Sequence, residues 1–126
     1  MDKTKLSVLA YEWLPDSMKN IHKALAGQSE IVFRNDPKSF QREMSKKQYD
    51  VIFMNVKGDT ASSFSLLEKT RILTPHTPII ITSRSEKAEL IVQAIKRGAF
   101  DFIAKPFKPG DLRAIIEKAA VELAGK

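Results

Sequence analysis

The chain contains no cysteine among its 126 residues. This absence excludes disulfide bonds, cysteine-ligated zinc and a thiol nucleophile, and it agrees with a reducing compartment. The sequence also lacks any apolar run that approaches the roughly 18 residues needed to cross a membrane, and its opening residues, 1–5, are mostly polar. We therefore expect a soluble cytoplasmic domain with no membrane partner.

A glycine-rich phosphate loop is missing after the first apolar run, Leu6–Ala10, and no spacing typical of a catalytic triad is present. Both absences argue against a nucleotide-binding enzyme or a hydrolase. Acidic charge is also in the minority, because the formal net charge is +6 and the isoelectric point about 9.6.

A basic balance suits a nucleic-acid partner or an acidic protein partner. Here the lysines and arginines are spread along the chain among carboxylates, and the densest pair, Lys46–Lys47, is short. We interpret most of them as solvated charges on helix surfaces. A basic domain that contacts nucleic acid directly stays as an alternative that depends on charge alone.

Short apolar runs alternate with helical patterns along the whole chain. The expected strands are Leu6–Ala10, Ile31–Phe33, Val51–Met54, Pro78–Thr82 and Phe100–Ala104. The expected helices span Asp16–Ala26, start at Pro37 after an Asp36 cap, surround Phe64 and Leu67, run from a Ser85 cap to Gly98, and open at Pro109. Strands that are apolar throughout are covered on both faces. The pattern therefore predicts an α/β fold: a flavodoxin-like, doubly wound, five-stranded parallel sheet of order 2-1-3-4-5 with five helices.

The length fits a single domain over residues 1–126, which is either complete or the amino-terminal part of a longer regulator. The inward faces of its last two helices are expected to carry Leu90, Ile91, Ala94 and Ile95, and then Leu112, Ile115, Ile116, Ala119 and Leu123.

One strand ends unusually: the apolar run Val51–Met54 leads directly into the polar residue Asn55 and a loop. In such a sheet, ligands bind at the carboxyl ends of the strands, where the strand order reverses. Asn55 should therefore meet the loop after Ala10, the loop after Ser83 and the residue Lys105 at one edge of the sheet.

Three segments carry a resemblance to a known family. They are Gly98-Ala99-Phe100-Asp101-Phe102-Ile103-Ala104-Lys105-Pro106-Phe107, the approach Tyr49-Asp50-Val51-Ile52-Phe53-Met54, and Thr77-Pro78-Ile79-Ile80-Ile81-Thr82-Ser83. In their order and spacing the chain resembles the receiver domain of response regulators in two-component signalling. The resemblance covers essentially the whole chain.

The resemblance implies a phosphorylation site that this sequence keeps only in part. In the family, an aspartate after the third strand takes a phosphoryl group, two acids after the first strand help to hold Mg²⁺, and a hydroxyl and a lysine contact the phosphoryl oxygens. The matching positions are Asn55 for the phosphoacceptor, Ala10 and Tyr11 for the acidic pair, Ser83 for the hydroxyl, Lys105 for the lysine and Phe102 for the switch aromatic.

An amide nitrogen does not attack a phosphoryl donor, because its lone pair is delocalised into the carbonyl group. Losing two carboxylates also removes most of the charge that would hold a cation. We therefore predict a pseudo-receiver with no catalytic residue, no metal site, no Mg²⁺ or other cofactor, and no enzyme activity.

Alternatives remain for the acids around this edge. Glu12 and Asp59 could form a weak cation site, although the simplest expectation places them in solvent as loop carboxylates. An ordinary receiver that is phosphorylated on another aspartate, such as Asp59, is a second possibility.

Lys105 is expected to pair with Asp59 or Glu12 or to reach solvent. We expect the peptide bond between Lys105 and Pro106 to be cis. Arg84 stands where the family favours a small residue, and it can cover the pocket, pair with Asp59 or face a partner.

Receivers of this family usually signal through the face formed by the fourth helix, the fifth strand and the fifth helix. In this sequence that face offers Ile91, Lys96, Arg97, Phe102, Lys108, Arg113 and Lys118. We expect a phosphorylation-independent interaction module that binds a protein partner or a second copy there, within a transcription regulator that has a carboxyl-terminal output domain.

Overall fold

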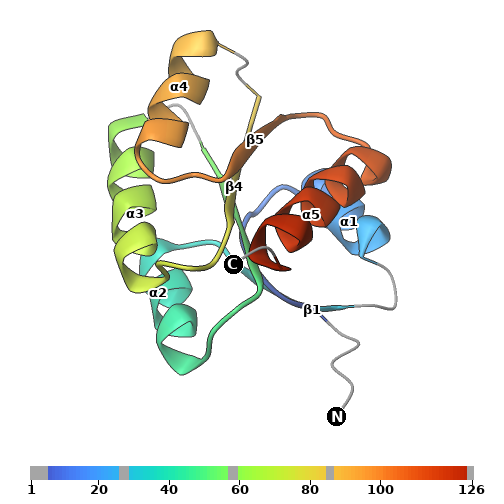
Figure 1. Cartoon of the computed structure of the whole chain (residues 1–126), viewed down its shortest axis with the longest axis horizontal. Helices are drawn as coiled ribbons and strands as arrows, with labels where there is room; N and C mark the ends of the chain where they lie inside the picture. The colour runs from blue at the N-terminus through green and yellow to red at the C-terminus, as the bar shows by residue number, and fades with distance from the viewer. Residues whose placement is uncertain (1–5, 26–28, 57–59, 85–86, 125–126) are drawn as a thin grey trace.

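A five-stranded parallel sheet forms the centre of the computed structural model, which describes residues 6–25, 29–56, 60–84 and 87–124 (Figure 1). Its strands are β1 (Leu6–Tyr11), β2 (Ser29–Arg34), β3 (Val51–Asn55), β4 (Ile79–Ser83) and β5 (Asp101–Ala104). The strand order is β2-β1-β3-β4-β5 and all four pairings are parallel. The predicted fold class and strand order are confirmed.

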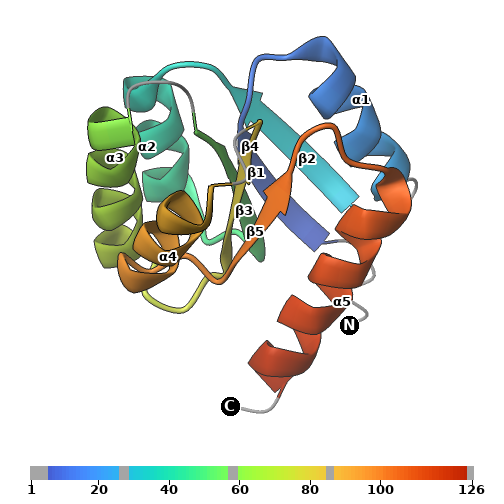
Figure 2. The ribbon, with the colours of Figure 1, turned by 90° about the horizontal axis from the view of Figure 1, so that it is seen from above.

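Five helices cover the two faces of this sheet: α1 (Pro15–Ala24), α2 (Pro37–Lys46), α3 (Thr60–Leu73), α4 (Ala88–Lys96) and α5 (Pro109–Ala124). Figure 2 shows α1 and α5 on one face and α2, α3 and α4 on the other. The central strands β3 and β4 are covered on both sides and fully buried, which explains why their sequences are largely apolar, whereas the edge strands β2 and β5 are less buried and carry charged residues.

The two faces of the sheet make two separate hydrophobic cores. Val8, Phe53 and Ile80 belong to the core beneath α1 and α5. Their neighbours along the same strands belong to the core beneath α2, α3 and α4: Leu9, Ile52 and Ile81. Successive side chains of a strand point to opposite faces, so alternate residues of each strand belong to different cores.

Local signals set several helix ends where the sequence predicts them. Asp36 is the N-cap of α2, its carboxylate accepts a hydrogen bond from the Ser39 backbone N–H at 2.9 Å, and Pro37 is the first helical residue. Gly98 follows α4 with φ of +114°, a conformation that favours glycine. A Cβ at Gly98 would also lie 2.6 Å from Cδ of Arg71, whose guanidinium donates to the Gly98 carbonyl at 2.9 Å.

The predicted inward face of α4 is partly wrong. Ala94 is fully buried, but the Ile95 side chain is 44% exposed, because α4 is short and covers only the edge of the sheet with one narrow side. On α5 the expected burial of Leu112, Ile116 and Ala119 is confirmed. The predicted Ser85 cap and the Leu123 side chain lie outside what the structure describes.

Candidate functional site

The carboxyl edge of the sheet brings together residues that are far apart in the sequence. Tyr11 lies opposite Met54 in the β1–β3 pairing, so the next residue, Glu12, comes beside Asn55. Asn55 in turn lies opposite Thr82 of β4. The predicted meeting of the first, third, fourth and fifth strand ends is therefore observed, with Glu12 as its acidic member.

Glu12 is buried, with 2% of its surface exposed, and its carboxylate accepts four hydrogen bonds. Oε2 accepts from Nδ2 of Asn55 at 3.0 Å and from the backbone N–H groups of Trp13 at 2.9 Å and Leu14 at 3.1 Å. Oε1 accepts from Nζ of Lys105 at 2.7 Å. The expectation that Glu12 is a loop carboxylate in solvent is wrong, because Glu12 continues the alternation of Val8 and Ala10 and its side chain therefore points to the same, buried side of the sheet.

Lys105 forms a buried ion pair with Glu12, and the two side chains are only 4% and 1% exposed. The Lys105 backbone N–H donates to the Ser83 carbonyl at 2.7 Å, and the Lys105–Pro106 peptide is cis as predicted. Burial lowers the pKa of the Lys105 ammonium, while the hydrogen bond and the charge of Glu12 act in the opposite direction. Of the three partners considered for Lys105, the structure selects Glu12.

The two positions matched to the acidic pair do not face this ion pair. Ala10 is fully buried in the core beneath α1 and α5. Tyr11 points to the opposite face, where its ring lies 5.2 Å from the ring of Trp13 and 5.3 Å from that of Phe40. Burial, and then the charge of Asp36, raise the pKa of the Tyr11 hydroxyl. Tyr11 therefore serves as packing surface at the end of β1.

The remaining matched positions are the hydroxyl and the switch aromatic. Ser83 ends β4 and is buried, with 3% of its surface exposed. Phe102 is half-buried and packs against the core beneath α2, α3 and α4. Ser83 and Lys105 thus lie on adjacent strand ends, as the sequence predicts.

Two pockets flank the ion pair. The larger one, about 530 Å³, is lined by the start of α1, the exposed Arg84, Lys105 and Pro106. The other, about 300 Å³, lies between α2 and α3 and includes Tyr11, Trp13 and Asn55 in its wall. Arg84 therefore borders the space above Lys105, which is one of the three roles considered for it. Asp59 lies outside the described residues.

The opposite charges of Glu12 and Lys105 offset one another at this edge. Glu12 supplies one negative charge and Lys105 one positive charge within hydrogen-bonding distance. Among the residues that the structure describes, no group of three or more aspartate, glutamate, histidine or cysteine side chains could hold a metal. The oxygens of Glu12 are already occupied by four donors, so this carboxylate is poorly placed to act as a nucleophile or a metal ligand.

The residues predicted for the interaction face divide into two groups. Lys96 and Lys108 are exposed, Ile91 is half-buried, and Lys118 pairs with Asp101 at 3.1 Å beside β5. Two arginines instead turn to neighbouring helices. Arg97 pairs with Glu68 of α3 at 3.0 Å, and Arg113 donates to the carbonyl of Ala24 at the end of α1 at 3.2 Å.

Sequence reasoning placed Ile95 inward and did not include Val92, yet both are exposed on α4, at 44% and 49%. They add apolar surface near the half-buried Ile91 and Phe102.

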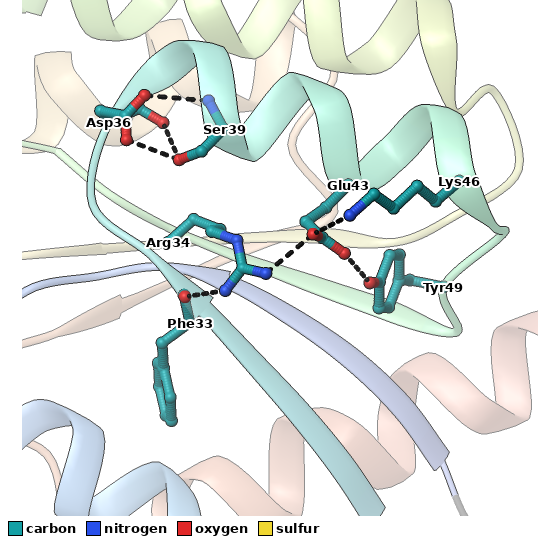
Figure 3. A network of polar contacts seen from close by, with 7 residues as sticks. All are labelled: Phe33, Arg34, Asp36, Ser39, Glu43, Lys46 and Tyr49. Carbon is teal, nitrogen blue, oxygen red and sulfur yellow. Dashed lines mark hydrogen bonds and ion pairs between the residues drawn. The ribbon is translucent and has the colours of Figure 1, made fainter.

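A second buried carboxylate lies on the other side of the sheet. Figure 3 shows Glu43 of α2 between Arg34, Lys46 and Tyr49, at 2.8, 3.1 and 2.9 Å. The Tyr49 hydroxyl, and then the two cations, hold the pKa of Glu43 at about 2, against its ordinary 4.5. Burial and the hydrogen bond to Glu43 raise the pKa of Tyr49 to about 12. This network fixes α2 to the edge of the sheet.

The sequence profile of the response regulator receiver domain family matches residues 12–117 of this chain. The chain belongs to the receiver domain family. The suggested resemblance is confirmed, and with it a module of two-component signalling whose fold is not that of a catalytic domain.

Curated relatives of this receiver are transcriptional regulators. The DNA-binding transcriptional regulator NtrC of Escherichia coli is 26% identical over 113 residues, which is 85% of this chain and 24% of that protein. The nitrogen assimilation regulatory protein NtrX of Azorhizobium caulinodans is 34% identical over 79 residues, 61% of this chain and 17% of that protein. The chain therefore spans about a fifth of the length of the curated relatives it matches.

Solved structures share the receiver fold. A response regulator from Thermotoga maritima superposes with a TM-score of 0.85 at 21% identity, covering 91% of this chain and 97% of that one. NtrX from Brucella abortus, in a complex with ADP, superposes with a TM-score of 0.84 at 24% identity, covering 95% of this chain and 28% of that one.

No helix within the described residues of the receiver has the length and apolar composition to span a membrane.

Sequence reasoning missed Glu12 as the central acid, although a signal for it existed. Val8 and Ala10 alternate onto the same face as Val51 and Phe53, and continuing both patterns by two residues brings Glu12 and Asn55 together. The parity of the strands, and not the match to the family pattern, identifies the side chain that faces Asn55.

Proposed function

We propose that this receiver regulates through protein contacts without accepting a phosphoryl group. The observation that carries the proposal is the bonding of Glu12, which engages both Asn55 and Lys105. Asn55 supplies an amide where a nucleophile is needed, and the cation that would stabilise a transferring phosphoryl group is already neutralised by an internal carboxylate.

The same bonding supports the absence of a Mg²⁺ cofactor and of enzyme activity. Phosphoryl transfer needs a divalent cation that neutralises negative charge, and this edge of the sheet has no excess negative charge among its described residues. The Glu12–Lys105 pair instead fastens the start of α1 to the end of β5. We infer that the domain keeps one conformation at this edge, which a partner recognises as it stands.

The face proposed for that partner is formed by α4, β5 and α5. Exposed Val92 and Ile95 supply apolar area, while Lys96, Lys108 and Lys118 supply positive charge around it. We propose that this face binds a protein partner or a second copy of the domain. Arg97 and Arg113 take part only indirectly, because they hold α4 to α3 and α5 to α1.

The relatives suggest the context. They are longer regulators, and one carries the name of a DNA-binding transcriptional regulator. We propose that this domain is the cytoplasmic amino-terminal part of a transcription regulator, with an output domain after it and no direct nucleic-acid contact needed for its signalling function.

The test is to incubate the protein with acetyl phosphate and Mg²⁺ and to measure its intact mass, with a receiver that keeps the aspartate as positive control. We expect no added mass here and one phosphoryl group on the control. An adduct that hydroxylamine removes would contradict the proposal. Repeating the reaction with Asp59→Asn would then show whether that aspartate is the acceptor, which is the second candidate function.

The contact face has its own test by size-exclusion chromatography with light scattering. If the domain self-associates through this face, Ile95→Glu should shift it toward the monomer. Ile72→Glu is the matched control, because Ile72 is an exposed isoleucine on α3, outside the proposed face. An equal effect of both changes, or persistence of the dimer in Ile95→Glu, would exclude self-association through α4.

A further inference from the structure

The outer face of α2 carries a row of cations. Lys38, Arg42 and Lys46 are exposed and follow one another at four-residue steps. At a rise of 1.5 Å per residue, neighbouring members are about 6 Å apart along the helix. We call these three residues the α2 cation row.

Positive charge is concentrated around this helix. Residues 34–47 contain five lysines and arginines but only two carboxylates, an excess of three out of the +6 of the whole chain. The only carboxylate on α2 itself is Glu43, which is 7% exposed and engaged by Arg34, Lys46 and Tyr49. The outward face of α2 therefore has no acid of its own.

The row remains available to a partner. Within the part of the chain that the structure describes, Lys38 and Arg42 take part in no ion pair. Lys46 bonds to Glu43, but its side chain is 60% exposed and its ammonium has further donors. Asp36 acts on Arg42 electrostatically without forming an ion pair with it, and Glu43 offsets part of the charge of Lys46, so the row keeps a net positive charge that an external anion can bind.

The helix that presents the row is held rigidly. Phe40 of α2 is fully buried in the core, Asp36 caps the first turn, and Glu43 ties the middle of the helix to Arg34 and Tyr49. The helix backbone, and with it the spacing of the three cations, therefore needs no rearrangement when a partner binds, and only the lysine and arginine side chains have to be ordered. The arrangement is therefore pre-organised for a ligand with matching charge spacing.

We propose that the α2 cation row is a docking surface for an acidic helix of a protein partner, one with carboxylates at four-residue steps. A helix that lies along α2 can bring carboxylates of the same four-residue spacing opposite the three cations, and ion pairs between neighbouring helices also set partner choice in coiled coils. This surface lies on the face of the sheet opposite α5, and its use does not depend on whether the domain is phosphorylated.

Two other polyanions fit the row less well. Affinity for nucleic acid grows with the number of phosphates that a protein neutralises, roughly six to ten in strongly salt-dependent binders, whereas the row offers three cations along about 12 Å. Peripheral membrane helices insert large apolar side chains, and none of the exposed large apolar residues recorded in the structure lies on α2. An acidic helix needs neither feature.

The test uses a synthetic helical peptide with glutamate at every fourth position, and a scrambled peptide of the same composition. Binding is followed by fluorescence anisotropy at low and at physiological salt. We expect the regular peptide to bind more tightly than the scrambled one, to weaken as salt rises, and to lose roughly tenfold in affinity for Lys38→Glu/Arg42→Glu.

The matched control is Lys19→Glu/Lys23→Glu on α1, which reverses two exposed lysines at the same spacing and changes the net charge equally. It should leave the affinity for the regular peptide unchanged. Circular dichroism checks that each variant is folded, and Lys38→Gln/Arg42→Gln replaces the reversal if folding fails.

Four outcomes would overturn the proposal: no binding of the regular peptide, equal binding of the scrambled peptide, equal losses in the α1 and α2 variants, or tighter binding of duplex DNA that the α2 variant abolishes. The last outcome would assign the row to nucleic acid. A loss confined to the α2 variant and to the regular peptide supports it.

Discussion

Two buried glutamates of this domain differ in where their partners come from. Glu43 is bonded to Arg34, Lys46 and Tyr49, which lie within nine residues of it in the sequence. Glu12 is bonded to Asn55 and Lys105, 43 and 93 residues away. The Glu43 network holds α2 to the preceding strand, β2. The Glu12 network joins the ends of β1, β3 and β5, which are far apart in the sequence.

The two networks also differ in solvent exposure. The cations around Glu43 are 37% and 60% exposed, whereas Lys105 is 4% exposed. Water can replace an exposed cation, but it cannot easily replace a buried one. The carboxylate of Glu43, at the rim of the sheet, holds neighbouring elements together, whereas the carboxylate of Glu12, at the carboxyl ends of the strands, occupies the donors of the candidate site.

The largest effect is expected for Lys105→Met, which leaves the carboxylate of Glu12 buried without its cation. We expect a loss of about 3–5 kcal/mol in the free energy of unfolding, because an unpaired charge stays in the interior. Urea denaturation monitored by circular dichroism measures it. Glu12→Gln/Lys105→Met should lose much less, since no charge remains to be buried, and a double variant as unstable as the single one would contradict the ion-pair account.

The stabilisation that the Glu43 network provides should depend on pH in the acid range. Its folded pKa of about 2 lies below its ordinary value of 4.5, so its stabilisation is complete above pH 4.5 and is lost as the pH falls toward 2. At about 1.4 kcal/mol per pKa unit, the shift sets an upper limit of about 3.5 kcal/mol. Water around the exposed Arg34 and Lys46 side chains screens the interaction, so we expect roughly 2–3 kcal/mol. Thermal melts between neutral pH and about pH 2, compared with Glu43→Gln, measure this contribution, and an NMR midpoint of Glu43 near 4.5 would exclude it.

Removing one donor from the Glu43 network should have a smaller effect. Tyr49→Phe deletes the hydroxyl that donates to Glu43 at 2.9 Å, and we expect a loss of about 1–2 kcal/mol in unfolding free energy. The NMR midpoint of Glu43 should rise in the same variant, because this hydroxyl is the main cause of its low pKa. A stability loss without any change in the midpoint would mean that Tyr49 acts only through packing.

The smallest effect is expected at the rim. Lys46→Met removes a cation whose side chain is 60% exposed, and we expect a change below about 0.5 kcal/mol. Methionine keeps the length and most of the apolar stem of the lysine. A loss as large as that of Lys105→Met, under the same urea conditions, would remove the distinction between the two networks.

Most of the fold could be predicted from local patterns. Apolar runs located all five strands to within two residues at each end, and Asp36–Pro37, Gly98 and Pro109 marked helix ends. Ile95 was misplaced because periodicity gives the width of an apolar stripe but not how much of it a short edge helix can cover.

The candidate site could be predicted only in part. The sequence located Asn55, Ser83 and Lys105 at one edge, and the structure places them there. It gave Glu12 only as one of several possible partners of Lys105 and did not pair it with Asn55, because matching to a family pattern assigns positions in order and ignores which face of the strand each side chain occupies. Arg97 and Arg113 were assigned to a contact face since exposure and charge are visible in a sequence, but their hydrogen-bond partners are not.

Residue types and their spacing along the chain are sufficient to predict the parallel α/β fold and the amide at the position where the family has a nucleophile. The bonding of Glu12 to both Asn55 and Lys105 follows only from the folded chain. That bonding depends on strand register and on burial, which bring together groups up to 93 residues apart and remove the water that would otherwise separate them.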